Sequence, residues 1–215
     1  MSDLPSYLPG FAAAFGILVV AASSPGPAVA MLLGIAMGQG RGPALVAALG
    51  IACGSVVLNL GTLIGVGVLL SQAAWAMTAL RWLGAAYLAY LAWGAWRKAL
   101  APPRIKAAEL APRSTARLFL AGFLLQVTNP KAVVFWLAIA SVGATAGGGT
   151  GIIALFVLGA FLISFACHGA WALLLSAGPI RRGYGRARGW IEAGLGTFFL
   201  FAAYGLATSE INETP

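Results

Sequence analysis

The sequence predicts an all-α integral membrane protein of six transmembrane helices, arranged as two inverted three-helix halves whose first and fourth helices are broken. Composition gives the class: 60% of the 215 residues are hydrophobic, 8% are charged, and the mean hydropathy is +0.92. These values are far from those of a soluble globular domain. Two polar motifs predict the broken helices, because each interrupts a long apolar stretch. They are Ser24-Pro25-Gly26-Pro27 and Thr128-Asn129-Pro130-Lys131.

Long apolar runs define the individual helices, since one crossing needs roughly 20 such residues. The runs lie at residues 7–37, 43–70, 82–96, 118–140, 152–177 and 190–207. The first run would measure roughly 46 Å at about 1.5 Å per residue, which exceeds a hydrocarbon core of about 30 Å. Tilt or the proline break must therefore absorb the excess. Asp3 precedes this run and no Lys or Arg does, so we expect a retained first helix and not a signal peptide.

The distribution of basic residues predicts the topology. Six Lys or Arg fall between residues 97 and 117, four fall between 181 and 188, and Arg41 follows the first helix, so eleven of thirteen lie on one side of a six-span chain. Short basic loops stay cytoplasmic, and both termini should then face outward. We expect one membrane domain, with residues 1–98 as the first half, 99–117 as a basic cytoplasmic loop and 118–215 as the second half. Nucleic-acid binding is disfavoured, because the net charge of +8 resides in juxtamembrane loops.

The two broken helices indicate a transport site. A break leaves backbone groups without intrahelical partners, which is tolerated where protein or a water-filled cavity replaces them. One half begins outside and the other inside, which is the pattern of an inverted repeat. Transporters of this kind hold their substrate near the bilayer midplane, with the N-termini of half-helices directed at an anionic group. Prolines that merely kink two packed helices are the alternative interpretation.

Lys131 is the most consequential candidate residue. An ammonium group at membrane depth costs at least about 2.5–3.5 kcal/mol unless it is paired or hydrated, and no acid neighbours Lys131 in the sequence. We interpret Lys131 as an anchor for a substrate carboxylate; snorkelling, or bonding to carbonyls freed by Pro130, is the alternative. The candidate substrate-binding residues are Ser24, Pro25, Gly26, Pro27, Asn59, Thr128, Asn129, Pro130 and Lys131.

Coupling to protons would require a titratable group within the spans. His168 in the fifth run and Glu192 near the inner end of the sixth are the candidates. Histidine changes its charge near neutral pH, and intramembrane acids often form proton relays. A packing role for His168, and interhelical hydrogen bonding by Asn59, remain the alternatives.

The chain resembles the LysE/RhtB family of amino-acid exporters, whose members carry Pro-Gly-Pro in the first helix and Asn-Pro-Lys-Ala in the fourth. The matching segments here are 25–27 and 129–132, with Gly84-Ala85-Ala86-Tyr87-Leu88 in the third run. The resemblance implies a secondary exporter of small amino acids or related metabolites in the bacterial cytoplasmic membrane, working by proton antiport. Many members place Asp where this chain has Ala28, which here favours a neutral or zwitterionic substrate over a cationic one.

Two other classes of function are considered. Cys53 and Cys167 lie in separate helices, and a membrane thiol-disulfide oxidoreductase would use such a pair, although neither has a Cys-x-x-Cys context. A non-transporting membrane assembly protein is the second alternative. Glycines at four-residue spacing, such as Gly50 and Gly54, predict close helix packing, within one chain or in a homodimer. No cofactor and no metal site is predicted, since no ligand cluster is visible.

Overall fold

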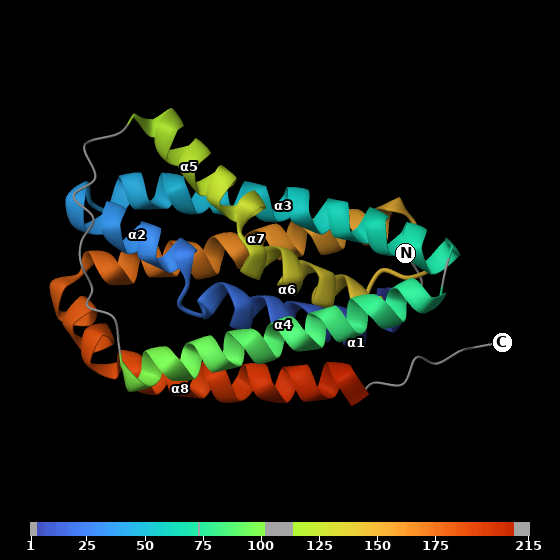
Figure 1. Ribbon diagram of the computed structural model, residues 1–215. Helices are drawn as coiled ribbons and strands as arrows, with labels where there is room; N and C mark the ends of the chain where they lie inside the picture. The colour runs from blue at the N-terminus through green and yellow to red at the C-terminus, as the bar shows by residue number, and fades with distance from the viewer. Residues whose placement is uncertain (1–3, 73, 102–113, 209–215) are drawn as a thin grey trace. The chain divides into compact units, whose positions relative to one another are not determined.

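The computed structural model describes residues 4–72, 74–101 and 114–208, and the regular structure among these residues is entirely α-helical (Figure 1). The helices are α1 (Leu4–Ser23), α2 (Pro27–Gly38), α3 (Arg41–Gln72), α4 (Ala74–Leu100), α5 (Thr115–Thr128), α6 (Pro130–Ser141), α7 (Thr150–Ser176) and α8 (Gly178–Thr208). The all-helical class predicted from composition is confirmed for this part of the chain.

Several features of the sequence lie outside the described residues. They are most of the 99–117 loop, with Arg104, Lys106, Glu109 and Arg113, and the terminal acids Asp3, Glu210 and Glu213. The expected cytoplasmic position of that loop and the outward position of both termini therefore stay predictions.

The first and fourth apolar runs are each divided into two helices at the proline motifs. In the first run, α1 ends at Ser23 and α2 begins at Pro27, and in the fourth run, α5 ends at Thr128 and α6 begins at Pro130 with a bend of 61°. Proline has no N–H for the helical ladder, yet it fits the first helical turn, where that N–H would have no partner. Each proline motif thus ends one helix and starts the next.

Helix length and apolarity identify the candidate membrane spans. Among the described residues, α1, the Arg41–Gly65 part of α3, and α7 are each long and apolar enough to cross a membrane, and the bent pair α5–α6 is a fourth candidate if it counts as one span. These helices make the chain a multi-pass membrane protein. The finer arrangement of six crossings in two inverted halves stays a prediction.

The chain divides into two compact units, and helices α3 and α8 each contribute to both. One unit comprises Met1–Val66 and Ile105–Gly183, and the other comprises Gly67–Arg104 and Tyr184–Pro215. Both proline breaks and most of the candidate site residues belong to the first unit, which we call the break unit. We call the second the α4–α8 unit.

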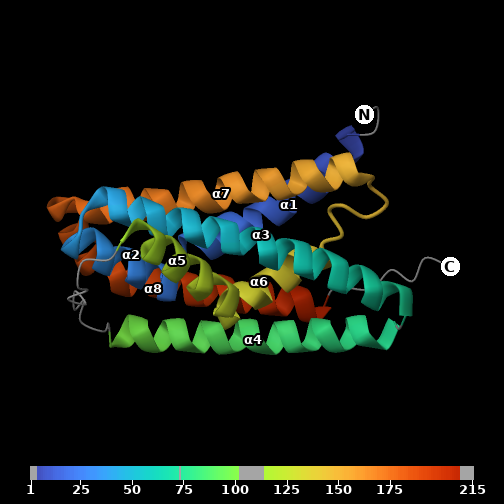
Figure 2. The same ribbon diagram turned by 90° about the horizontal axis from the view of Figure 1, so that it is seen from above.

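In the break unit, the halves of the two broken helices pair with each other. Helix α1 packs on α6 and α2 packs on α5, while α7 lies along both α1 and α2 (Figure 2). One apolar core, with Leu32 and Ile51 fully buried, joins α2 to α3, and a second, with Phe156 and Trp136, joins α1, α6 and α7. This pairing brings the two breaks to the same place between the two cores.

Helices α3 and α5 approach so closely that only glycine fits at three contact positions. A Cβ atom added at Gly50 would lie 2.1 Å from the Phe119 carbonyl oxygen, and one added at Gly122 would lie 2.1 Å from the Ala47 carbonyl oxygen. At Gly54 the nearest atom would be Cβ of Gln126, at 2.9 Å. The four-residue spacing of Gly50 and Gly54 therefore serves a contact within this chain, as small residues commonly do between membrane helices.

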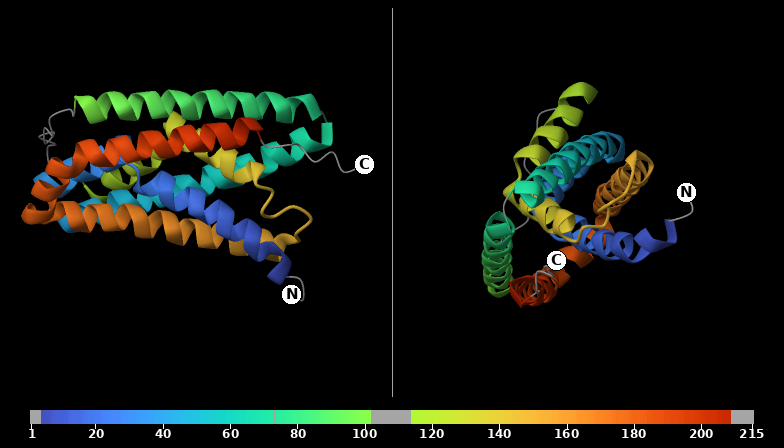
Figure 3. Two further views of the ribbon diagram at one scale, coloured as in Figure 1. Left: turned by 90° about the horizontal axis from the view of Figure 1, so that it is seen from below. Right: turned by 90° about the vertical axis from the view of Figure 1, so that its right-hand side faces the viewer.

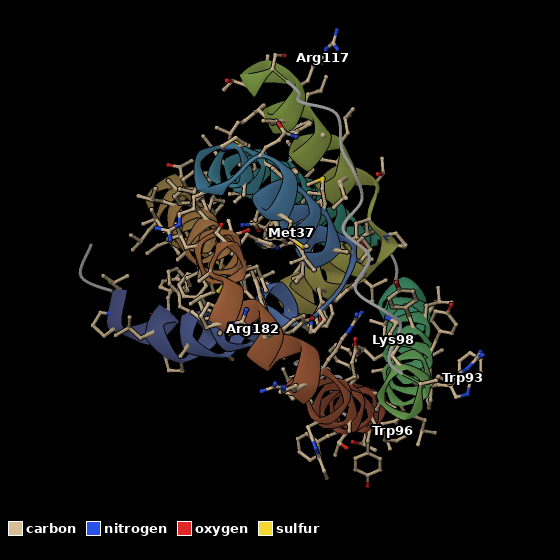
Figure 4. All side chains as sticks on the ribbon, turned by 90° about the vertical axis from the view of Figure 1, so that its left-hand side faces the viewer. Met37, Trp93, Trp96, Lys98, Arg117 and Arg182 are labelled. Carbon is tan, nitrogen blue, oxygen red and sulfur yellow. The ribbon has the colours of Figure 1, made fainter. Side chains whose placement is uncertain are left out.

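The α4–α8 unit is a pair of helices in which α4 and the later part of α8 run side by side (Figure 3). Trp96 of α4 lies between them (Figure 4), and a Cβ atom at Gly196 of α8 would be 2.5 Å from the Trp96 ring. The guanidinium of Arg97 stacks 4.8 Å from the ring centroid of Trp93. The close contact between α4 and α8 in this unit is thus made by the Trp96 ring packed against Gly196.

Substituting Gly50 tests the α3–α5 contact. Gly50→Ala places a methyl group against the backbone of α5, and such overpacking typically costs about 1–3 kcal/mol. We expect a lower thermal midpoint for the detergent-solubilised protein, measured by size-exclusion chromatography after heating. Gly61→Ala on the same helix is the matched control, since nothing lies within 4 Å of its added Cβ, and its midpoint should not fall. Equal midpoints for the two variants would contradict the contact.

Candidate substrate site

A small polar cavity lies where the two breaks meet in the break unit. Its volume is about 40 Å³, and α1, α2, α3, α5, α6 and α7 all contribute to its wall. The polar lining residues are Ser24, Gln126, Asn129, Lys131, Ser55, Ser164 and His168. The rest of the lining is apolar and includes Phe135 and Trp136. Among the described residues, no acid lines this cavity.

Lys131, which belongs to the second break, contacts Ser24 of the first break. Its Nζ donates a hydrogen bond to the Ser24 hydroxyl oxygen and a second, of 3.2 Å, to the Ser24 carbonyl oxygen. The ammonium group also lies 5.9 Å from the ring centroid of Phe135, within the range of a cation–π contact. Among the described lining residues, the Lys131 cation is thus held by oxygens and an aromatic face.

The proline break is what makes the Ser24 oxygens available. The Ala21 carbonyl has no N–H donor at Pro25, and the Ser24 hydroxyl donates to that carbonyl instead, at 2.8 Å. Since the single hydroxyl proton is used there, the lone pairs of the Ser24 oxygen accept from Lys131. The Ser24 carbonyl likewise belongs to the residue that follows the end of α1.

Two helix N-termini converge on the cavity. Gly26, Pro27 and Ala28 at the start of α2 line it, as do Asn129 and Lys131 at the start of α6. The Asn129 side chain caps α6 by accepting from the Lys131 backbone N–H at 3.1 Å, whereas α2 has no side-chain cap. Uncapped N–H groups and the helix dipole both favour an anion at the start of α2.

The far wall of the cavity carries a buried chain of hydrogen bonds across three helices. Gln126 Nε2 of α5 donates to Ser55 Oγ of α3 at 2.9 Å, and Ser55 Oγ lies 3.0 Å from Ser164 Oγ of α7. His168 Nδ1 is 2.8 Å from the Ser164 carbonyl oxygen, one helical turn away on α7. The cavity therefore has a cationic end at Lys131 and a neutral polar end at His168.

Most of the predicted site residues lie at the cavity or at the breaks beside it, and three of them lie elsewhere. Ser24, Gly26, Pro27, Asn129 and Lys131 line the cavity, as does His168; Pro25 and Pro130 form the breaks beside it. Thr128 is exposed, and its hydroxyl bonds back to the Leu124 carbonyl at 2.7 Å. Asn59 is 1% exposed but is not among the lining residues, and Glu192 belongs to the α4–α8 unit.

Glu192 and the two cysteines lie outside the residues that line the cavity. Glu192 Oε1 lies 3.9 Å from Arg188 Nε on the same helix, α8. Cys53 and Cys167 are both free and half-buried, and neither is among the residues that line the cavity. The geometry offers no support for the thiol-disulfide alternative.

Ser55 and Ser164 are site residues that the sequence analysis missed. Each is a small hydroxyl residue within an apolar run, and alone it looks like an ordinary helix residue. One signal was present: Ser164 and His168 are four residues apart, which places them on the same face of a helix. A hydroxyl residue one turn from the lone histidine could have directed attention to that face of α7.

Apolar spans, two broken helices and a polar cavity at their junction define a membrane transporter. Comparison with known proteins gives the family: the chain belongs to the LysE family, since the model of the LysE type translocator matches residues 19–210.

Two threonine efflux proteins match most of the chain, and a third relative matches about a third of it. The threonine efflux protein of Escherichia coli (strain K12) is 31% identical over 196 residues, 87% of this chain and 91% of that protein. The threonine efflux protein of Salmonella typhi is 32% identical over 199 residues, with the same coverage. The homoserine/homoserine lactone efflux protein of Salmonella typhimurium is 38% identical over 76 residues, 35% of this chain and 36% of that protein. No solved structure matches the chain.

Asn59 provides a stability test outside the cavity. Both polar atoms of its amide are buried without a hydrogen-bond partner in the part of the chain that the structure describes, a state that costs about 1–3 kcal/mol. Asn59→Leu removes this cost with a side chain of similar shape, so we expect a higher thermal midpoint in detergent. Asn59→Asp, which buries a charge at the same place, should lower it. A lower midpoint for Asn59→Leu would show that the amide is needed in the folded protein.

Proposed function

We propose that the protein exports small zwitterionic amino acids from the bacterial cytoplasm, and that it binds them in the cavity between the two breaks. The observation that carries this proposal is the Lys131 ammonium group, which lines a polar cavity that contains no acid among the described residues. A carboxylate is the complementary ligand for such a cation.

The substrate carboxylate binds between Lys131 and the start of α2. Lys131 supplies charge, and the uncapped N–H groups that follow Pro27 supply hydrogen-bond donors. The proximity is close, since a Cβ atom at Gly26 would lie only 3.3 Å from Lys131 Nζ. When the carboxylate arrives, it takes the place of Ser24 as the partner of the ammonium group.

The positive charge of the cavity and the names of the relatives support the same class of substrate. A second cation beside Lys131 would meet no acid among the described lining residues, which disfavours lysine-like substrates. Threonine and homoserine, which the relatives' names give as their substrates, are small, zwitterionic and hydroxylated. We therefore place this chain's substrates in that group.

The cavity is smaller than a pocket that holds a ligand, which typically measures about 300–1,000 Å³. At about 40 Å³ it represents a closed form, and export needs alternating access in which the inverted halves open to one side and then the other. Ser55 lies near the middle of α3, which favours a site near the bilayer midplane. In the break unit, the N-terminal ends of α3, α5 and α8 lie toward one end (Figure 1), and they carry the exposed Arg41, Arg117 and Arg182. We assign this end to the cytoplasm.

Lys131 is tested by export from cells that are fed dipeptides containing threonine or homoserine. Lys131→Gln keeps a hydrogen-bond donor for Ser24 but loses the charge, and Lys131→Ala loses both. We expect at least about a tenfold fall in efflux for each, because a hydrogen bond to a charged group is lost.

Lys98→Ala, which removes the exposed lysine of α4, is the control and should export normally. Thermal midpoints establish that the variants fold. Normal efflux by folded Lys131→Gln would disprove the carboxylate anchor.

Proton antiport is the proposed driving reaction, with His168 as the titratable group at the cavity and Glu192 as the second candidate. Purified protein in liposomes should accumulate labelled threonine when the lumen is more acidic than the medium, because protons leaving the lumen drive threonine inward. A protonophore should abolish the accumulation and spare threonine exchange at equal pH. Accumulation that ignores the pH gradient would exclude antiport.

A further inference from the structure

The proposed binding of the substrate carboxylate by Lys131 does not involve the neutral polar residues of the cavity. His168 is buried in α7, lines the cavity, and faces it together with Ser164 and Ser55. An amino acid bound by its carboxylate at Lys131 also carries an ammonium group, which needs hydrogen-bond acceptors once it has left water.

The hydrogen bond of His168 fixes which ring nitrogen can accept. Nδ1 lies 2.8 Å from the Ser164 carbonyl oxygen, and a carbonyl only accepts, so Nδ1 carries the proton. In the neutral ring, Nε2 then has the lone pair. The imidazole is therefore held with its basic nitrogen as an acceptor, and Nδ1 stays with the backbone of its own helix.

Other acceptors on the cavity wall are weaker. The hydroxyl groups of Ser55 and Ser164 bond to each other at 3.0 Å, and Ser55 also accepts from Gln126. Among the described lining residues there is no carboxylate, so the imidazole nitrogen is the most basic neutral acceptor available to an ammonium group.

We propose that Nε2 of His168 binds the ammonium group of the exported amino acid, so that a proton on His168 and the substrate exclude each other. This inference rests on the proposed function and names the second half of its site. The substrate ammonium donates to the Nε2 lone pair and keeps all of its own protons. If Nε2 already holds a proton, that proton leaves to water before the substrate binds.

The charged groups around the cavity support this exclusion. Helix α6 contributes Lys131, and the lining residues from α1, α2, α3 and α5 include no other titratable side chain among those described. Protonated His168 has no lone pair at Nε2 and would repel a substrate ammonium group, and the described lining residues offer no acid to either cation. The cavity therefore holds either the proton on His168 or the substrate ammonium group.

The wild-type protein in detergent provides the first test, with threonine as the probe and calorimetry in buffers of different ionisation enthalpy as the measurement. Threonine should bind more weakly once the pH is low enough to protonate His168, and binding at that pH should release up to about one proton. The comparison ligand is 3-hydroxybutyrate, which is threonine without its amino group. Its binding should release no proton, whereas a titrating Lys131 would affect both ligands alike.

Variants of His168 provide the second test. His168→Gln keeps a neutral acceptor but cannot take up a proton, so threonine should bind with no pH dependence and no proton release. His168→Leu removes the acceptor and should weaken threonine binding about tenfold or more. Cys167→Ala, on the neighbouring residue of α7 and away from the cavity lining, should behave as the wild type does.

The outcomes separate the two proposals. Threonine binding to wild type without proton release, equal pH dependence for the two ligands, or wild-type behaviour of His168→Leu would overturn the role of His168 and leave amino-acid export standing. Absence of export for every amino acid supplied as a dipeptide would instead defeat the proposed function itself.

Discussion

The bond between the Lys131 ammonium and the two Ser24 oxygens is the interaction on which the site depends. A cation inside an apolar bundle must find acceptors, and the described residues offer no acid there. The first proline break supplies them, because the chain leaves α1 at this point and turns its last oxygens toward α6. The second break places the lysine opposite, at the start of α6. The contact thus joins one residue from each of the two breaks.

The polar far wall depends on a different constraint, the close approach of α3 and α5. Gln126 reaches Ser55 at 2.9 Å only because the backbones meet at Gly50, Gly54 and Gly122, where no side chain would fit. From Ser55 the hydrogen bonds continue to Ser164 on α7. The glycines therefore influence the cavity indirectly. By letting α3 and α5 approach, they allow Gln126 and Ser55 to form a hydrogen bond, and without it these buried polar groups would lose a partner.

The parts of the fold that could be predicted from sequence are those set by local chemistry. A proline within an apolar run has no N–H to donate, whatever its surroundings, so both breaks and the place of Lys131 could be predicted. The rotational position of a residue on a long apolar helix has no such local signal. Asn59 and Thr128 were therefore placed in the site although they lie outside the cavity lining, and Ser55 was missed although it lies within it. The size of the cavity depends on helix packing, which short motifs do not encode.

The charge of the cavity explains why Ala28 matters. Ala28 and Lys131 both line the cavity, and the resemblance noted from the sequence places an Asp at the position of Ala28 in many exporters. An acid at this position would neutralise the lysine and offer a charged partner to a substrate ammonium group. With alanine there, the described lining keeps one positive charge and no negative one, so a zwitterion leaves the net charge unchanged and a cationic amino acid doubles it. Alanine at this position therefore agrees with the proposed zwitterionic substrate, and it leaves the neutral imidazole of His168 as the proposed partner of the substrate ammonium group.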